Sequence, residues 1–94
     1  MENKIIQKLK EIMPEIKQRY PLDSVAVFGS ITRNDFSAKS DVDILIDFKS
    51  DDFLLFNELA EELEKILGKK IDLVTTRSLK PRQIEYLKDK LQYV

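Results

Sequence analysis

The sequence predicts an α/β (α+β) fold in which helices flank a small three-stranded mixed sheet, in the order α-β-α-β-α-β-α. Two observations lead to this prediction. Apolar residues recur at helical spacing at both ends and in the middle of the chain, and three short apolar runs between these segments are typical of strands. The 94 residues suit a single domain over residues 1–94, and they contain no repeat, low-complexity segment or internal linker.

The N-terminal segment is predicted to be a helix that a proline interrupts. Its apolar residues recur with a helical period, which indicates a helix from about Glu2 to Ile12. Pro14 should kink or divide the segment, because the residue before a proline avoids the α region. A short second turn is then expected to reach Tyr20.

Three apolar runs are predicted to be the strands. Ser24–Phe28 is apolar on both faces, as in a buried strand. Val42–Phe48 alternates between apolar and polar residues except at Leu45. Ile71–Val74 is the third and shortest run. These three strands form the predicted sheet.

Two more helices are predicted from their end signals. Asp51 or Asp52 caps a central helix, and Gly68 closes it. Pro81 starts the last helix. The apolar face of this last helix consists of Ile84, Leu87 and Leu91.

The composition excludes several kinds of site. With no cysteine and no histidine, the chain cannot form disulfides, thiolate zinc sites or Ser-His triads. A metal site must use oxygen ligands, which favours hard cations such as Mg²⁺. The net charge of -1 gives no general attraction to nucleic acid or to acidic membranes. Since no apolar run resembles a membrane span or a signal peptide, we expect a cytoplasmic protein.

Three aspartates are candidates for a metal site. Asp41 and Asp43 lie two residues apart on a predicted strand and therefore project the same way, and Asp72 joins them if its strand is adjacent. At an effective dielectric of ~20, each pair of carboxylates ~4 Å apart costs about 4 kcal/mol, which a divalent ion would relieve. Alternatively, Asp41 only terminates a loop.

Gly29-Ser30 forms a strand-to-helix junction that suits a phosphate group. A glycine lets a phosphate approach the backbone, and a short helix through Asn34 would add free N–H groups. Ser30 either donates to the phosphate or only caps the helix. Arg33 either reaches a phosphate or pairs with Asp35. Both alternatives stay open at this point.

These elements combine into a specific motif. Gly29-Ser30, ten intervening residues and Asp41-Val42-Asp43 reproduce a GS-x10-DxD signature. The sequence therefore resembles the DNA polymerase β-like nucleotidyltransferase superfamily, and Asp72 stands where that superfamily carries its third carboxylate.

Residues around the signature are similar to those of the minimal nucleotidyltransferase (MNT) proteins. The similar positions are Phe28, Arg33 and Ser40, and the resemblance extends over most of the chain. Asn34 departs from the pattern, since many relatives have glycine after the arginine.

The resemblance implies an Mg²⁺-dependent nucleotidyltransferase that uses ATP. It implies two Mg²⁺ ions held by the catalytic carboxylates Asp41, Asp43 and Asp72, with Asp72 also accepting a proton. It implies a nucleotide-binding set of Gly29, Ser30, Arg33 and Ser40.

The resemblance to MNT proteins also implies a partner. Larger relatives carry a further domain for the acceptor, which these 94 residues do not accommodate. MNT proteins are the antitoxin halves of HEPN–MNT pairs and transfer AMP from ATP to a tyrosine of the HEPN toxin. A hetero- or homo-oligomer would supply the acceptor surface. Two alternatives remain: an antitoxin that acts by binding alone, and transfer to a small molecule such as an aminoglycoside.

Overall fold

The sheet contains four strands in the order β3-β2-β1-β4. The computed structural model describes residues 3–33, 36–37 and 39–94. Strands β2 and β3 are parallel, whereas β1 is antiparallel to both of its neighbours. The elements are α1 (Lys4–Arg19), β1 (Leu22–Phe28), a 3₁₀-helix (Gly29–Thr32), β2 (Val42–Phe48), α2 (Phe53–Leu67), β3 (Ile71–Thr75), a second 3₁₀-helix (Thr76–Ser78), α3 (Pro81–Leu87) and β4 (Gln92–Tyr93).

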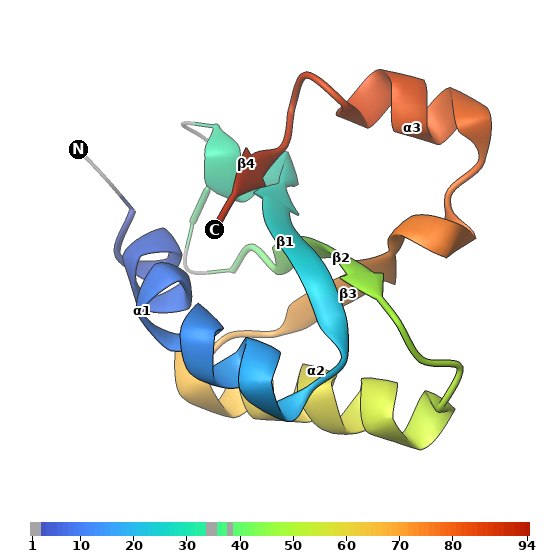
Figure 1. Cartoon of the computed structure of the whole chain (residues 1–94). Coiled ribbons are helices and arrows are strands. Elements are labelled where there is room, and N and C mark those ends of the chain that lie inside the picture. Colours follow the sequence, from blue (N-terminus) through green and yellow to red (C-terminus); the bar gives the residue numbers. More distant parts are fainter. Residues whose placement is uncertain (1–2, 34–35, 38) are drawn as a thin grey trace.

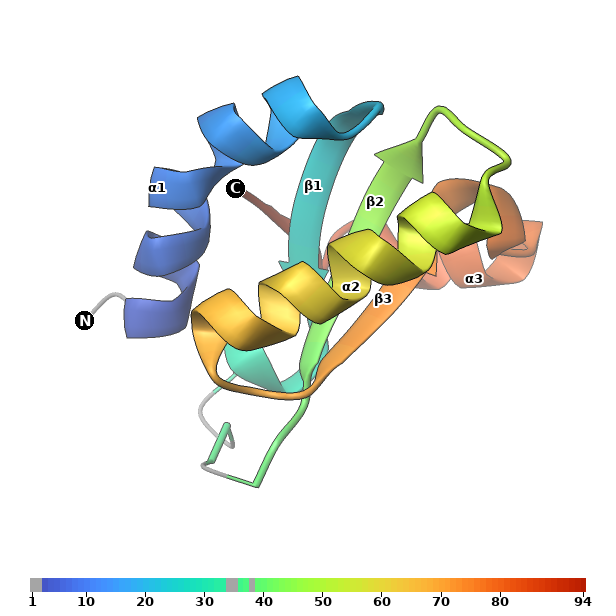
Figure 2. The same ribbon diagram turned by 90° about the horizontal axis from the view of Figure 1, so that it is seen from below.

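The hydrophobic core lies between the sheet and two of the helices. Figures 1 and 2 show α1 and α2 on one side of the sheet and α3 on the other. Fully buried side chains come from both of the first two helices, for example Leu9 of α1 and Leu59 of α2, whereas α3 has no buried residue. None of the helices in the described part of the chain is long and apolar enough to cross a membrane.

Strand β2 directs its apolar residues toward this core. Val42 and Ile44 are completely buried, and Asp43 and Asp47 alternate with the buried positions on the opposite face. Leu45 also belongs to this opposite face and is nevertheless buried, because it lies beneath the segment that contains α3. The interruption of the alternating pattern therefore marks where α3 covers the sheet.

Helix α1 is continuous, so of the two effects expected of Pro14, a kink or a division, the division is wrong. The helix runs from Lys4 to Arg19 with Pro14 inside it. Met13 and Ile16, on either side of the proline, are 4% and 2% exposed, and burying them favours the helix more than one missing hydrogen bond opposes it. The expected start at Glu2 lies outside the described residues.

The C-terminal segment also differs from the prediction. Helix α3 ends at Leu87 and does not reach Leu91, and the chain then forms β4, which pairs with β1. The Val94 N–H donates to the Val25 carbonyl at 3.0 Å. The predicted three-stranded sheet thus gains a fourth strand, since β1 would otherwise leave an edge of unpaired backbone groups. Strand β4 is only two residues long, which is too short to show an alternating pattern in the sequence, so it was not predicted.

The other predicted elements are confirmed with small changes in length. The predicted bounds of β2 match the structure, while β1 starts earlier, at Leu22, and β3 ends later, at Thr75. The short helix after β1 ends at Thr32, and its expected extension to Asn34 lies outside the described residues. Gly68 closes α2 in the left-handed conformation, with φ of 66°.

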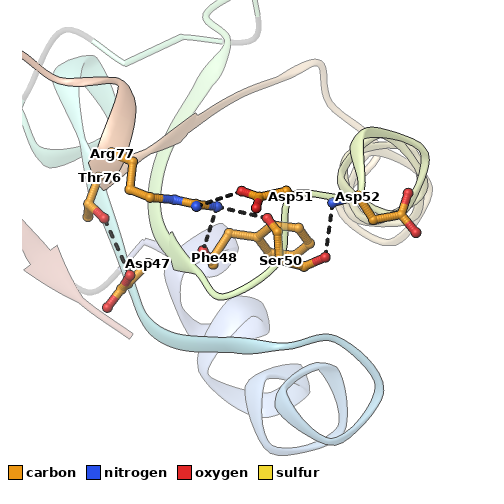
Figure 3. A network of polar contacts seen from close by, with 7 residues as sticks. All are labelled: Asp47, Phe48, Ser50, Asp51, Asp52, Thr76 and Arg77. Carbon is orange, nitrogen blue, oxygen red and sulfur yellow. Dashed lines mark hydrogen bonds and ion pairs between the residues drawn. The ribbon is translucent and has the colours of Figure 1, made fainter.

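The connection between β2 and α2 is held by Arg77, which follows β3. Figure 3 shows its guanidinium donating to the carbonyls of Phe48 and Ser50, at 3.2 and 2.8 Å, and to Asp51, at 2.7 Å. Asp51 is therefore an ion-pair partner, and the cap of α2 is its neighbour Asp52.

Asp52→Ala is expected to lower the stability of the fold. The Asp52 carboxylate accepts hydrogen bonds from the N–H groups of Leu54 and Leu55, at 3.0 and 3.1 Å. Losing such a cap costs about 1 kcal/mol, or a Tm decrease of about 4–8 °C in a domain of this size. Asp51→Ala is the control, because its carboxylate is 92% exposed and its ion pair contributes little. Thermal melts of both variants test this, and equal Tm decreases would contradict it.

Candidate active site

Three neighbouring strands place Phe28, Asp43 and Asp72 side by side. Phe28 of β1 pairs in register with Asp43 of β2, which in turn pairs with Asp72 of β3. Residues opposite one another in a sheet project from the same face. This row of side chains therefore crosses the sheet on the face turned toward α3.

The Asp43 carboxylate is surrounded by negative charge. Partial burial raises its pKa most, followed by repulsion from Asp72 and then from Asp41, and a hydrogen bond with Asp72 acts in the same direction. The positive charge of Arg33 opposes this shift in the pKa. The structure thus brings the other two predicted carboxylates and the predicted arginine within electrostatic reach of Asp43.

Gly29 lies directly against the Asp43 side chain. Its φ is 75°, in the region that side chains rarely allow, and a β-carbon there would collide with Asp43 Oδ2 and lie 3.2 Å from Asp43 Cγ. Only glycine both adopts this φ readily and has no β-carbon to collide with Asp43. The first residue of the GS-x10-DxD signature and its second aspartate are thus in contact, although 13 positions separate them in the sequence.

The turn after Gly29 is closed by its own hydrogen bonds. Thr32 Oγ1 donates to the Gly29 carbonyl at 2.8 Å, and the Arg33 N–H donates to the Ser30 carbonyl at 3.0 Å. These bonds place Ser30 and Arg33 at the end of the sheet where the carboxylates lie. The alternative pairing of Arg33 with Asp35 involves a residue outside the described part of the chain.

Ser40 makes contacts within its own loop. Its hydroxyl accepts from the Ser37 N–H at 3.1 Å and lies 3.3 Å from the Ser37 hydroxyl, and its N–H donates to the Ser37 carbonyl at 3.1 Å. The Ser40 hydroxyl thus contacts its own loop, directly before Asp41. Its contact with a nucleotide remains a prediction.

The carboxylates fit a divalent cation in kind and in charge. Among the described residues, no three acidic side chains lie close enough to hold a metal ion by themselves. Asp43 and Asp72 are the pair that lies in register. Mg²⁺ commonly takes one or two carboxylates and completes its shell with water and phosphate oxygens. This pair fits that pattern, with Asp41 adding negative charge nearby.

Two pockets flank the row of side chains. The β3-side pocket has a volume of about 560 Å³, and its lining includes Asp72, Val74, Leu79 and Arg82. The β1-side pocket has a volume of about 600 Å³, and its lining includes Gly29, Thr32, Arg33 and Lys90. Both pockets are also lined by Phe28, Tyr86 and Leu87.

Sequence reasoning did not identify the residues that the C-terminal segment adds to these pockets. Tyr86 is 66% exposed and therefore does not pack in the core as an aromatic residue near an apolar helix face usually does. Arg82 and Lys90 look like ordinary charged residues of a solvated helix. The spacing of four between Tyr86 and Lys90 was the available signal, but it does not show which face of the sheet the segment covers.

Comparisons with known proteins agree on one family and one fold. The profile of the family described as nucleotidyltransferase domain matches residues 8–94. The protein adenylyltransferase MntA of Thermococcus cleftensis is 46% identical over 67 residues, which cover 70% of this chain and 68% of the relative. The structure of a candidate minimal nucleotidyltransferase is similar with a TM-score of 0.83 and 29% identity, covering 100% of this chain and 97% of that one.

A solved toxin–antitoxin structure with AMP-PNP contains a further similar chain. The TM-score is 0.67 and the identity 28%, over 98% of this chain and 70% of that one. The fold of this chain thus recurs in a chain of a toxin–antitoxin structure that was determined with an ATP analogue.

Proposed function

The chain belongs to the nucleotidyltransferase family, and from this premise we propose that it transfers AMP from ATP to a tyrosine of a partner HEPN toxin and so acts as the antitoxin. The match over residues 8–94 confirms the resemblance predicted from the signature, and the chain is a nucleotidyltransferase. Its similarity to the protein adenylyltransferase MntA supports a protein acceptor. Its similarity to a chain of a toxin–antitoxin structure with AMP-PNP supports ATP as the donor and a toxin as the partner.

The observation that carries this proposal is the register of β2 and β3 beside the glycine turn. Asp43 and Asp72 are paired, and Asp43 lies against Gly29. A phosphate held at the backbone of Gly29 and Ser30 is then next to the two carboxylates. This is the arrangement that transfer of a phosphoryl-linked group requires.

In the proposed reaction, the acceptor oxygen attacks the α-phosphorus of ATP. The bond between the α-phosphorus and the bridging oxygen breaks, and pyrophosphate leaves. Bound Mg²⁺ would supply charge neutralisation at the phosphates and polarisation of the acceptor hydroxyl. A tyrosine hydroxyl has an ordinary pKa of about 10, so it needs a base near neutral pH. Asp72 takes that proton, because it is exposed next to Asp43 and the chain contains no histidine.

Labelled ATP tests this function directly. The protein is incubated with ATP labelled at the α-phosphate, Mg²⁺ and a lysate of the host cell, and labelled proteins are separated on a gel. We expect one dominant labelled protein, and identifying it should show that it is the toxin. The double variant Asp41→Asn/Asp43→Asn is expected to give no label. A protein that binds ATP but labels nothing would contradict transfer to a protein and leave an antitoxin that acts by binding or a small-molecule acceptor.

A further inference from the structure

We propose that Lys90 binds the triphosphate of the nucleotide in the β1-side pocket, and that Tyr86 positions it there. This inference rests on the proposed function, because it requires ATP as the donor. It extends that function by adding a cation from the C-terminal segment to the nucleotide site.

The order of the strands places the two pockets on opposite sides of β2, and we assign the triphosphate to one side and the acceptor hydroxyl to the other. Gly29 follows β1 and lines the β1-side pocket, whereas Asp72 belongs to β3 and lines the β3-side pocket. Strand β2, with Asp43, lies between them. A triphosphate at the glycine turn therefore extends into the β1-side pocket, and the acceptor hydroxyl approaches from the side of Asp72.

The β1-side pocket needs positive charge if it holds a triphosphate. The whole chain has a net charge of -1, and Asp43, which feels the charges of Asp41 and Asp72, lies against Gly29 of the pocket lining, so attraction must come from local cations. Arg33 and Lys90 are the cationic side chains among the described residues that line it. Asp89 lines the same pocket and opposes them.

Lys90 is held over the pocket without a carboxylate partner. Its ammonium lies 4.2 Å from the centroid of the Tyr86 ring and donates to the Tyr86 carbonyl at 3.1 Å. No acidic group of the described residues pairs with it. By contrast, the nearby Lys88 pairs with Glu85 at 2.7 Å.

These contacts leave the Lys90 ammonium available to an anion. It has three N–H donors, and the Tyr86 carbonyl uses one of them. The remaining donors can bond phosphate oxygens while the Tyr86 ring keeps the lysine side chain beside the pocket.

Calorimetric titration with AMP-PNP and Mg²⁺ tests the inference without turnover. Lys90→Ala is expected to weaken AMP-PNP binding about tenfold, because a charge-assisted contact to phosphate is lost. AMP binding should change much less. Lys90→Arg should restore most of the affinity, and Asp89→Asn should increase it. Lys88→Ala is the matched control and should bind like the wild type.

Tyr86 requires a separate pair of variants. Tyr86→Phe keeps the ring and the backbone carbonyl and should bind AMP-PNP normally, whereas Tyr86→Ala should weaken binding severalfold. The rescue by phenylalanine separates positioning by the ring from any role of the hydroxyl. Thermal melts confirm that each variant is folded.

The outcomes separate this inference from the proposed function. If Lys90→Ala binds AMP-PNP as tightly as the wild type, or if Lys88→Ala loses as much affinity, the inference is overturned while the proposed function stands. If the wild-type protein binds no AMP-PNP, the proposed function fails and the inference fails with it.

Discussion

Asp43→Asn is expected to reduce AMP transfer by about 10²–10³-fold or more, because it removes a carboxylate from the centre of the reacting site. The substitution keeps the shape of the side chain, and Asp43 is only half-buried beside Gly29. The fold should therefore survive. A transfer assay with a labelled acceptor measures the loss, and full activity of this variant would refute the proposed role of Asp43.

The same variant is expected to be more stable than the wild type at neutral pH without divalent ions. Burial and the neighbouring carboxylates raise the pKa of Asp43 above its ordinary value of 3.8. Between the unfolded and folded pKa values, the folded protein binds more protons than the unfolded one, so stability falls as pH rises through this interval. At pH values above this interval, the folded protein bears the full free-energy cost of the ionised Asp43 carboxylate. Asparagine does not ionise and avoids that cost.

Melting curves in EDTA test this stabilisation. The Tm of Asp43→Asn should exceed the wild-type Tm by a few degrees at pH 7, and the difference should shrink as pH falls toward 3.8. Mg²⁺ should raise the Tm of the wild type more than that of the variant, since a bound cation relieves the same repulsion. A lower Tm of the variant at pH 7 in EDTA would contradict the account of the site's electrostatics.

Gly29→Ala is expected to damage both the fold and the active site. The alanine would have to adopt a φ of 75°, which costs about 1–2 kcal/mol. Its β-carbon would also collide with Asp43 Oδ2, and the carboxylate would have to move away. We expect a Tm decrease of about 4–8 °C for each kcal/mol lost, together with loss of AMP transfer.

Gly68→Ala provides a matched control. Gly68 has a similar φ of 66°, but a β-carbon there meets nothing within 4 Å. This variant carries the conformational cost alone, so it should lower the Tm less than Gly29→Ala and leave transfer unchanged. If Gly29→Ala retains normal transfer, the contact between Gly29 and Asp43 has no functional importance.

Most of the fold follows from local signals in the chain. The apolar runs predict β1, β2 and β3, and Asp52 with Gly68 marks the ends of α2. Local signals were misleading where tertiary contacts outweigh an unfavourable local preference. Pro14 disfavours helix in isolation, but burial of its neighbours in the core keeps α1 continuous.

The residues that gather at the candidate site were also predictable in part. The GS-x10-DxD signature indicates a glycine turn and a carboxylate pair at one site, because these features have few structural reasons to occur together. It does not predict their contacts. That Gly29 lies against Asp43, and that Ser40 bonds Ser37, depends on how the strands pair and how the loop returns.

The sequence by itself determined the order of the main helices and strands, the exclusion of thiol and histidine chemistry, and the family of the chain. These depend on periodicity, residue types and spacing, which are local properties. Only the tertiary structure decided the register that opposes Asp43 and Asp72, the pairing of β4 with β1, and the position of Tyr86 and Lys90 beside the glycine turn. The reason is that each of these contacts joins residues far apart in the chain, and their free energy depends on the packing of the whole sheet against its helices.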